Sequence, residues 1–221
     1  MQLTNAQEKL VKSLQTKKGR KETGLCLLEG QKIIDAAQGT IEFTFSIDEV
    51  KNFDKLVTTQ TPQDIAGVAK IPAWSHDEIN FKKTIVVLDG VQDPGNVGTI
   101  LRLCLGFDAS LILVDSADPT NPKVIRSSAG AIFDVPWIEV DRNHAINFIS
   151  SLKRQIYRLE KRQNAKGLKA TKFDKEIVLI AGSEGSGISL NIEGISIFIE
   201  HNPKLESLNV ASALAIALYS L

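Results

Sequence analysis

The sequence predicts an α/β protein in which helices cover a parallel β-sheet. The first observation is that continuously apolar runs of strand length, at 84–90, 109–115 and 176–182, have helix-like patterns between them. Strands buried on both faces of a parallel sheet give such runs, whereas half-exposed strands alternate apolar and polar residues. The second observation is the alternation of strands and helices along the chain, because helices then form the crossovers that parallel strands need.

Composition places the chain of 221 residues among ordinary globular proteins, with 43% hydrophobic and 24% charged residues. That length allows one large domain, or a small domain and a medium one. The longest apolar runs are too short to span a membrane, and the N-terminus lacks the apolar core of a signal peptide. Cys26 and Cys104 cannot form a disulfide framework. We therefore expect reduced thiols, a cytoplasmic location and no membrane association.

The first part of the chain predicts a small α/β domain. Its expected elements are a basic amphipathic segment at 3–14, strands at 24–30, 40–47 and 65–72, and a helix at 31–38. The polar, broken stretch 72–83 is the expected linker. We therefore place the two domains at 1–76 and 82–221.

The second domain carries the expected parallel sheet. Besides the three apolar runs, it predicts strands at 135–140 and 195–200, and helices at 97–105, from 123, near 144–152 and at 208–221. In open sheets of this class, ligands bind at the carboxyl ends of the strands. The loops that follow the strands are therefore the place to search for a site.

Two basic clusters stand out although the formal net charge is zero. One lies between Glu8 and Lys21 and the other between Lys153 and Lys172, and each contains a single acidic residue. Local patches of this kind matter more for binding a polyanion than the total charge does. Ordinary solvated helix faces are the alternative for either cluster.

Polar loops follow three of the expected strands. These loops lie at 92–104, 181–189 and 200–212. The first places Arg102 in an apolar helix pattern, with no acid within helical reach on its C-terminal side. The second is rich in glycine and contains Glu184. The third puts Ser207 and Asn209 at the mouth of a strongly apolar helix, where capping alone would explain them.

The glycine-rich loop does not match a known phosphate-binding motif. Its glycines follow the order G-x-x-G-x-G, and the carboxylate of Glu184 would repel a pyrophosphate at a helix N-terminus. A P-loop and a hydrolase nucleophile elbow are also absent from the sequence. A glycine-rich loop with an acid suits a ligand that carries positive charge or hydroxyl donors, and a plain strand-to-helix turn is the alternative.

In order, the three loops resemble the three motifs of the SpoU (TrmH-like) branch of the SPOUT RNA methyltransferases. The matching stretches are "NVGTILR", "GSEGSG" and "SLNV", which supply Asn96 and Arg102; Gly182, Glu184 and Gly187; and Ser207, Leu208 and Asn209. The stretch "VIRSSAGAIFDVP" is also similar to this group. The resemblance covers roughly 84–221, and the segment 18–37 resembles, more loosely, the small RNA-binding domain that precedes the catalytic domain in many members.

This resemblance implies transfer of a methyl group from S-adenosylmethionine to a ribose 2′-hydroxyl in RNA. Ribosomal RNA is the first expectation and transfer RNA the second. The implied fold is a parallel-sheet domain with a C-terminal trefoil knot, preceded by a small α/β RNA-binding domain, in a homodimer. Cofactor contacts are implied for Gly182, Ile199 and Leu208.

The implied catalytic residues are Arg102, Asn96, Glu184, Ser207 and Asn209. An arginine side chain stays protonated in proteins, so a neutral guanidine would be costly at pH 7. We therefore expect Arg102 to clamp a phosphate and to support the developing alkoxide, and the general base stays open. The residues expected to bind RNA are Lys17, Lys18, Arg20 and Arg126.

One departure concerns the third motif, where family members usually have isoleucine, proline and methionine. This chain has Ile199, Glu200 and His201 there, and an additional acid near the cofactor bears on affinity. His76, His144 and His201 are scattered, so we assign none to catalysis and expect no metal. The alternative functions are a non-catalytic RNA-binding or ribosome-assembly protein with this fold, and a small-molecule enzyme with a nucleotide cofactor.

Overall fold

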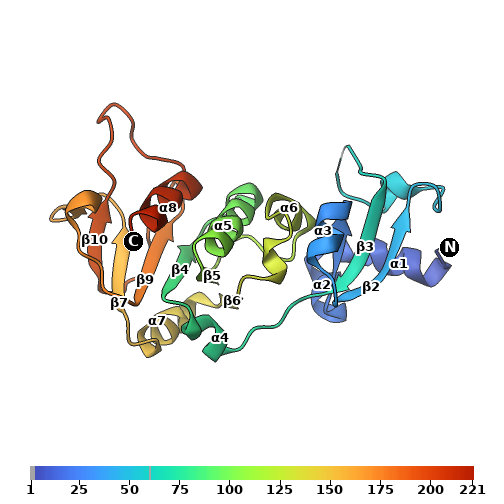
Figure 1. Ribbon diagram of the computed structural model, residues 1–221, viewed down its shortest axis with the longest axis horizontal. Coiled ribbons are helices and arrows are strands. Elements are labelled where there is room, and N and C mark those ends of the chain that lie inside the picture. The colour runs from blue at the N-terminus through green and yellow to red at the C-terminus, as the bar shows by residue number, and fades with distance from the viewer. Residues whose placement is uncertain (1–2, 60) are drawn as a thin grey trace. The chain divides into compact units, whose positions relative to one another are not determined.

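The computed structural model describes residues 3–59 and 61–221, and the chain divides into two compact units. Unit 1 consists of Met1–Ala73 and Asp118–Asp134, and unit 2 of Trp74–Ala117 and Val135–Leu221. Figure 1 labels most of the helices and strands of both. Unit 1 is thus discontinuous in sequence. The expected domains 1–76 and 82–221 are each continuous and do not assign 118–134 to the first domain.

Within the described residues, unit 1 contains a three-stranded antiparallel sheet of order β1-β3-β2. Its elements are α1 (Asn5–Leu14), α2 (Lys17–Thr23), β1 (Leu25–Glu29), α3 (Gln31–Ala36), β2 (Ile41–Ser46), η1 (Phe53–Lys55), β3 (Ile65–Lys70), α6 (Pro122–Ser127) and η2 (Ala131–Phe133). The three expected strands are confirmed. The expected segment 3–14 forms α1, which begins at a capping box between Thr4 and Gln7.

Within the described residues, unit 2 contains a seven-stranded sheet of order β6-β5-β4-β9-β7-β10-β8. Its elements are α4 (His76–Phe81), β4 (Thr84–Asp89), α5 (Pro94–Gly106), β5 (Ala109–Val114), β6 (Trp137–Val140), α7 (Arg142–Ser151), β7 (Gln155–Leu159), β8 (Lys166–Gly167), η3 (Leu168–Ala170), β9 (Ile177–Gly182), β10 (Ile195–Phe198) and α8 (Val210–Tyr219). Neighbouring strands all pair in parallel, which confirms the predicted parallel sheet.

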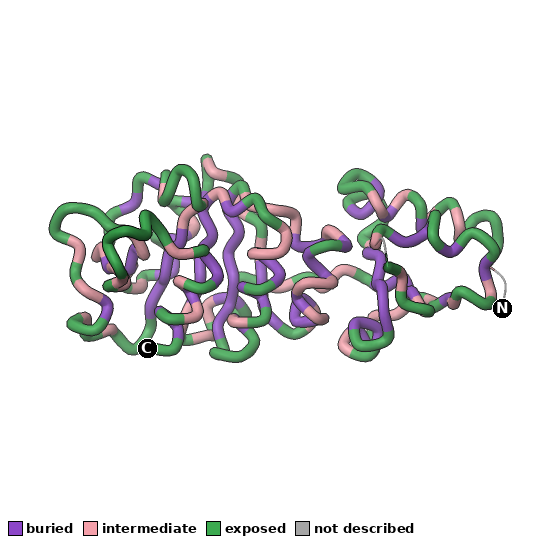
Figure 2. Tube along the Cα trace, turned by 90° about the horizontal axis from the view of Figure 1, so that it is seen from above, coloured by how far each residue is buried: buried purple, intermediate pink, exposed green. Residues whose placement is uncertain are grey.

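Helices cover both faces of this sheet. On one face, Ile79 of α4 and Ile149 of α7 pack with Ile85, Val87 and other strand residues in a buried cluster. The helices α5 and α8 pack against each other, and α5 contacts β5 while α8 contacts β9. Figure 2 shows the buried positions running along the strands of unit 2. None of the helices in the described part of the chain is long and apolar enough to cross a membrane.

Two elements of the second part were not predicted from the sequence. The expected linker 72–83 contains the helix α4, which starts at a capping box between Ser75 and Glu78. The basic segment 153–172 contains the inner strand β7, which pairs with both β9 and β10. The Arg158 side chain is buried there. Its guanidinium is satisfied by hydrogen bonds to the carbonyl oxygens of Leu190 and Ile192, at 3.0 and 2.7 Å.

Candidate active site

The site forms where β4 and β9 end side by side. These strands are parallel neighbours with Asp89 opposite Gly182, so the loops that follow them leave the same edge of the sheet. The first loop leads into α5, whose N-cap Asp93 accepts a hydrogen bond from the backbone of Asn96 at 2.9 Å. The second is the glycine-rich loop. Parallel pairing therefore brings together two of the three predicted motifs.

One polar side chain from each motif joins a shared hydrogen-bond network. The Asn209 amide donates to Asn96 Oδ1 at 2.9 Å and to Glu184 Oε1 at 2.8 Å. The Asn96 amide also donates to Glu184 Oε1, at 3.2 Å. Meanwhile Asn209 Oδ1 caps α8 by accepting from the backbone of Ala211 and Ser212. Capping is therefore only half of what Asn209 does, because its amide group also links the three loops.

Arg102 lies apart from this network, exposed on α5. No residue within 3–59 and 61–221 forms a hydrogen bond or an ion pair with its guanidinium. An unpartnered guanidinium keeps its donors available to an anion from outside the protein. Its position therefore suits a substrate contact better than a structural one.

The predicted cofactor residues meet in one cavity. Gly182, Ile199 and Leu208 all line a cavity of about 350 Å³, together with Glu184 and Ser207. The wall also includes apolar side chains from both the strands and the loops: Leu159, Ile188, Phe198, Val210 and Ala213. Within unit 2, the structure thus gathers both the cofactor set and part of the catalytic set around a single space.

Gly182 lets the glycine-rich loop close on itself. A Cβ at this position would lie 2.0 Å from the carbonyl carbon of Gly187. The backbones of Ser183 and Gly187 exchange two hydrogen bonds, of 3.2 and 2.9 Å. Gly187 itself has a φ of +64°, in the left-handed region that favours glycine. Both glycines are therefore needed for the shape of this cavity wall.

Of the two unusual residues ahead of the third motif, His201 lines the cavity and Glu200 does not. A Cβ on Gly167 would lie 2.1 Å from Glu200 Oε1, so this carboxylate lies over β8, and Glu200 is not among the cavity residues. His201 does line the cavity. Its Nδ1 lies 2.7 Å from the Ile199 carbonyl oxygen, and its Nε2 is buried without a hydrogen-bond partner in the described part of the chain. From the sequence, His201 was noted in the departure from the third motif and was assigned no role.

Charged side chains of both signs line the cavity. They are Glu160, Lys161, Glu184 and Glu206, and Glu160 is ion-paired with Arg158 at 2.8 Å and with Arg162 at 3.2 Å. Burial raises the pKa of Glu160, but hydrogen bonds from Arg158 and Ser196 outweigh that effect and lower the pKa below its ordinary value. Glu160 is therefore ionised at neutral pH. Among the described residues, no group of three or more His, Cys, Asp or Glu side chains could hold a metal ion.

The residues expected to bind RNA lie in unit 1 and differ in accessibility. Lys17 and Lys18 are exposed on α2, and Lys18 forms an ion pair with Glu22 at 3.8 Å. Arg20 is buried and pairs with Asp118 at 2.6 Å. The Arg126 guanidinium donates to Glu29 at 2.7 Å and to Thr58 at 2.6 Å. RNA binding by all four stays a prediction, and the internal ion pairs give both arginines a structural role as well.

Replacing Asn209 with aspartate separates its two roles. An aspartate caps a helix about as well as an asparagine, so α8 keeps its cap. The new carboxylate cannot donate to Asn96, and it would face Glu184 as a like charge. We expect Asn209→Asp to keep α8 helical, to lower the free energy of unfolding by about 1–3 kcal/mol, and to lose roughly tenfold in the rate of the methyl transfer that the resemblance implies, as checked by circular dichroism, urea unfolding and initial rates. An unchanged rate would show that the network does not contribute to the reaction.

The chain is similar to enzymes that methylate ribosomal RNA. It is 29% identical to the 23S rRNA (guanosine(2553)-2′-O)-methyltransferase RlmP of Bacillus subtilis, over 95% of this chain and 93% of that protein. It is 30% identical to the 23S rRNA (adenosine(1067)-2′-O)-methyltransferase of Streptomyces laurentii, over 75% of this chain and 64% of that protein. Among solved structures, an AdoMet-bound rRNA methyltransferase from Sinorhizobium meliloti superposes with a TM-score of 0.85 at 25% identity, covering 100% of this chain and 95% of the other.

A family comparison agrees with these relatives. Residues 83–219 match the SpoU rRNA methylase family, and this range contains all three motifs as well as the cavity. The predicted resemblance to the SpoU branch is therefore confirmed. Because the match spans more than half of the chain, this protein belongs to the SpoU rRNA methylase family.

Proposed function

We propose that the protein transfers a methyl group from S-adenosylmethionine to a ribose 2′-hydroxyl of RNA, with ribosomal RNA as the first candidate substrate and transfer RNA as the second. The observation that carries the proposal is the meeting of the three motifs in unit 2. Asn96, Glu184 and Asn209 share one network, and Glu184 also lines the cavity that contains the cofactor residues. Family membership and the named activities of the relatives support the same reaction.

The residues of the cavity fit S-adenosylmethionine. Its apolar wall suits the adenine ring, and the carboxylates of Glu184 and Glu206 suit a ligand with a positive charge. His201 adds a polar side chain to this wall. When bound, S-adenosylmethionine supplies the methyl group on its cationic sulfonium. The backbone at Gly182, Ile199 and Leu208 would hold the cofactor in place.

Arg102 is the residue that we assign to the RNA. Its exposed guanidinium would clamp a phosphate next to the target ribose and so bring the 2′-hydroxyl to the methyl group. The same positive charge would stabilise the negative charge that develops on the 2′-oxygen as its proton leaves. Asn96, Glu184 and Asn209 would hold the three loops in register, and Ser207 would contact the nucleotide from the cavity wall.

Further parts of the proposal concern architecture and assembly. We place a trefoil knot in the C-terminal segment that follows β9, and RNA binding by Lys17 and Lys18 in unit 1, in a cytoplasmic protein. A homodimer is supported by apolar side chains left exposed at the ends of α5 and α8, because large exposed apolar groups favour an interface. These side chains are Leu105, Phe107, Ile216, Tyr219 and Leu221.

The experiment that tests this function follows labelled methyl from S-adenosylmethionine into unmethylated ribosomal RNA, with transfer RNA in parallel. Label on a ribose of ribosomal RNA is the expected result, and label only on transfer RNA would reassign the substrate. Absence of label on both RNAs, with no cofactor binding, would favour a non-catalytic RNA-binding protein. Turnover in the absence of RNA would favour a small-molecule enzyme.

A further inference from the structure

We propose that Asp89 is a positioning residue for the cofactor site, because it ties down both ends of the glycine-rich loop 183–189. This inference rests on the proposed function, since the loop forms part of the cavity assigned to S-adenosylmethionine. Neither the sequence motifs nor the cavity lining includes Asp89. The residue lies at the carboxyl end of β4 and would act through the loop, without touching the cofactor.

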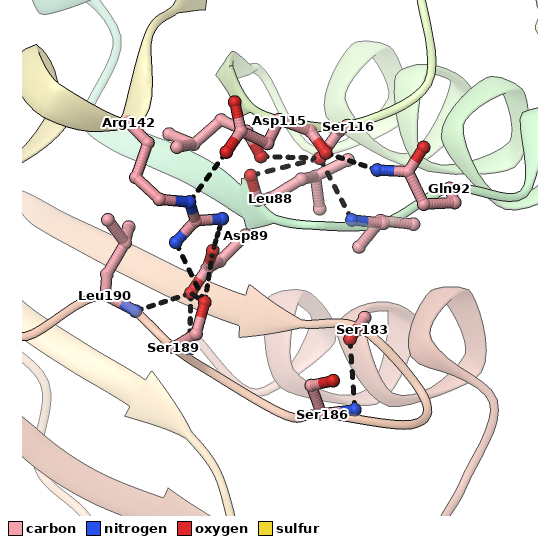
Figure 3. Close-up of polar contacts among 12 residues, drawn as sticks. Leu88, Asp89, Gln92, Asp115, Ser116, Arg142, Ser183, Ser186, Ser189 and Leu190 are labelled. Atoms are coloured by element: carbon pink, nitrogen blue, oxygen red, sulfur yellow. Dashed lines mark hydrogen bonds and ion pairs between the residues drawn. The ribbon is translucent and has the colours of Figure 1, made fainter.

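The two ends of the loop are held by different parts of Asp89. At the first end, the Ser183 backbone N–H donates to the Asp89 carbonyl oxygen at 3.1 Å. At the second end, the carboxylate accepts from the backbone of Ser189 at 2.5 Å and of Leu190 at 2.7 Å. The Ser189 hydroxyl adds contacts of 3.1 Å to both carboxylate oxygens. Figure 3 shows Ser189 and Leu190 converging on the Asp89 carboxylate.

The carboxylate of Asp89 is a buried charge whose counter-ion, Arg142, is shared with Asp115. Only 1% of Asp89 is exposed, and Arg142 of α7 donates to its Oδ1 at 2.8 Å. Arg142 also donates to Asp115 at 2.6 Å and to the Ser189 hydroxyl at 2.8 Å. Hydrogen bonds raise the pKa of Arg142, and the bond to Asp115 has a larger effect than the bond to Asp89. A buried charge is tolerated only when it is paired and hydrogen-bonded. The Asp89 carboxylate therefore has to keep its contacts with Arg142, Ser189 and Leu190 in the folded protein.

The residues between the two anchors form the cavity wall. Ser183, Glu184, Ser186, Gly187 and Ile188 all line the cavity, and Glu184 also joins the network with Asn96 and Asn209. A loop fixed at both ends loses less conformational entropy when a ligand binds. Release of the second anchor would therefore weaken cofactor binding although no group that contacts the cofactor has changed.

A matched pair of serine variants tests this idea with little disturbance. Ser189→Ala removes a hydroxyl that contacts Asp89 but keeps the buried ion pair. Ser110→Ala is the control, because it removes a buried hydroxyl that donates to the Ile79 carbonyl oxygen at 2.8 Å, at the other end of the parallel strands. Asp89→Asn is the stronger variant, because an amide places an N–H₂ group where the carboxylate accepts hydrogen bonds.

The primary measurement is the dissociation constant of S-adenosylhomocysteine by calorimetry. We expect a rise of about tenfold for Asp89→Asn, equivalent to about 1.4 kcal/mol, a smaller rise for Ser189→Ala, and no rise for Ser110→Ala. Hydrogen exchange of peptide 183–190 in the ligand-free protein should be faster in both loop variants. In turnover, KM for S-adenosylmethionine should rise while KM for RNA stays unchanged.

Two results would overturn the inference. One is a dissociation constant in Ser189→Ala and Asp89→Asn equal to that of the wild type, with only the thermal unfolding temperature lowered. The other is unchanged hydrogen exchange of peptide 183–190 in both variants. If the wild type bound no S-adenosylhomocysteine, the proposed function would fail, and the exchange measurement would still decide whether Asp89 holds the loop. Should Asp89→Asn not fold, Ser189→Ala alone decides.

Discussion

Replacing Arg102 with alanine is expected to lower the methyl-transfer rate by about 10²–10³-fold or more while cofactor affinity stays at the wild-type value. The rate falls because the guanidinium that would neutralise charge on the phosphate and on the 2′-oxygen is gone. Affinity is kept because Arg102 does not line the cavity and has no partner among residues 3–59 and 61–221. Single-turnover rates with labelled S-adenosylmethionine and calorimetry with S-adenosylhomocysteine measure the two quantities separately.

Arg102→Lys sharpens the same test. A lysine keeps the positive charge but loses the planar, two-pronged geometry with which an arginine binds a phosphate. We expect this variant to recover only part of the rate that Arg102→Ala loses. Equal rates for Arg102→Lys and the wild type would reduce the role of Arg102 to net charge, and a full rate in Arg102→Ala would remove the residue from the mechanism.

Arg20→Ala is expected to lower the free energy of unfolding of unit 1 by about 3–5 kcal/mol. The Arg20 guanidinium donates to Asp118 at 2.6 Å, to Thr120 at 3.0 Å and to the Leu14 carbonyl oxygen at 2.9 Å. Removal of the cation leaves the Asp118 carboxylate without its counter-ion. Urea unfolding followed by a signal specific to unit 1 gives the measurement.

The exposed Lys18 supplies the contrast for Arg20. Lys18→Ala should leave the unfolding free energy unchanged, because its ion pair with Glu22 is solvent-exposed, and should weaken RNA binding instead. If Arg20→Ala unfolded like the wild type and weakened RNA binding as Lys18→Ala does, then Arg20 would act on RNA and not on stability. The pair of variants therefore separates two roles that the sequence could not distinguish.

Low pH should weaken the ion pair between Arg20 and Asp118. Burial raises the pKa of Asp118, but hydrogen bonds from Thr120 and Arg20 outweigh it, so the folded-state pKa lies below the ordinary value. The contribution to stability is therefore complete above the unfolded pKa of about 3.9 and is lost as the pH falls through the lower, folded pKa. An Asp118→Asn variant should show a flatter loss of stability across that acidic range.

The parallel sheet of unit 2 was accessible from the sequence because its central strands are buried on both faces. Thr84–Asp89, Ala109–Val114 and Ile177–Gly182 are almost continuously apolar, so no competing pattern obscured them. The strand β7 was missed for the opposite reason. Arg158 is buried within it, and its charge is balanced by Glu160, two residues further along the chain, at 2.8 Å. A local pattern cannot reveal a buried ion pair of this kind.

The candidate site divides in a similar way. The resemblance to the SpoU motifs supplied the proposed catalytic and cofactor residues, because each motif is short and local. Asp89 lay outside that reasoning, since its contacts are with groups brought close only by folding. The carboxylate of Asp89, for example, meets the backbone of Ser189, which is 100 residues further along the chain. Distances of that kind follow from strand order, which the apolar runs alone do not determine.

The discontinuity of unit 1 also has a consequence for synthesis of the chain on the ribosome. Arg20 emerges 98 residues before its partner Asp118, and β4, α5 and β5 of the other unit are made in between. At about 5–20 residues per second, this interval lasts roughly 5–20 s. Unit 1 therefore cannot complete its folding first although its sequence starts the chain, and a fragment that stops at residue 73 would expose an arginine whose buried position requires a later segment.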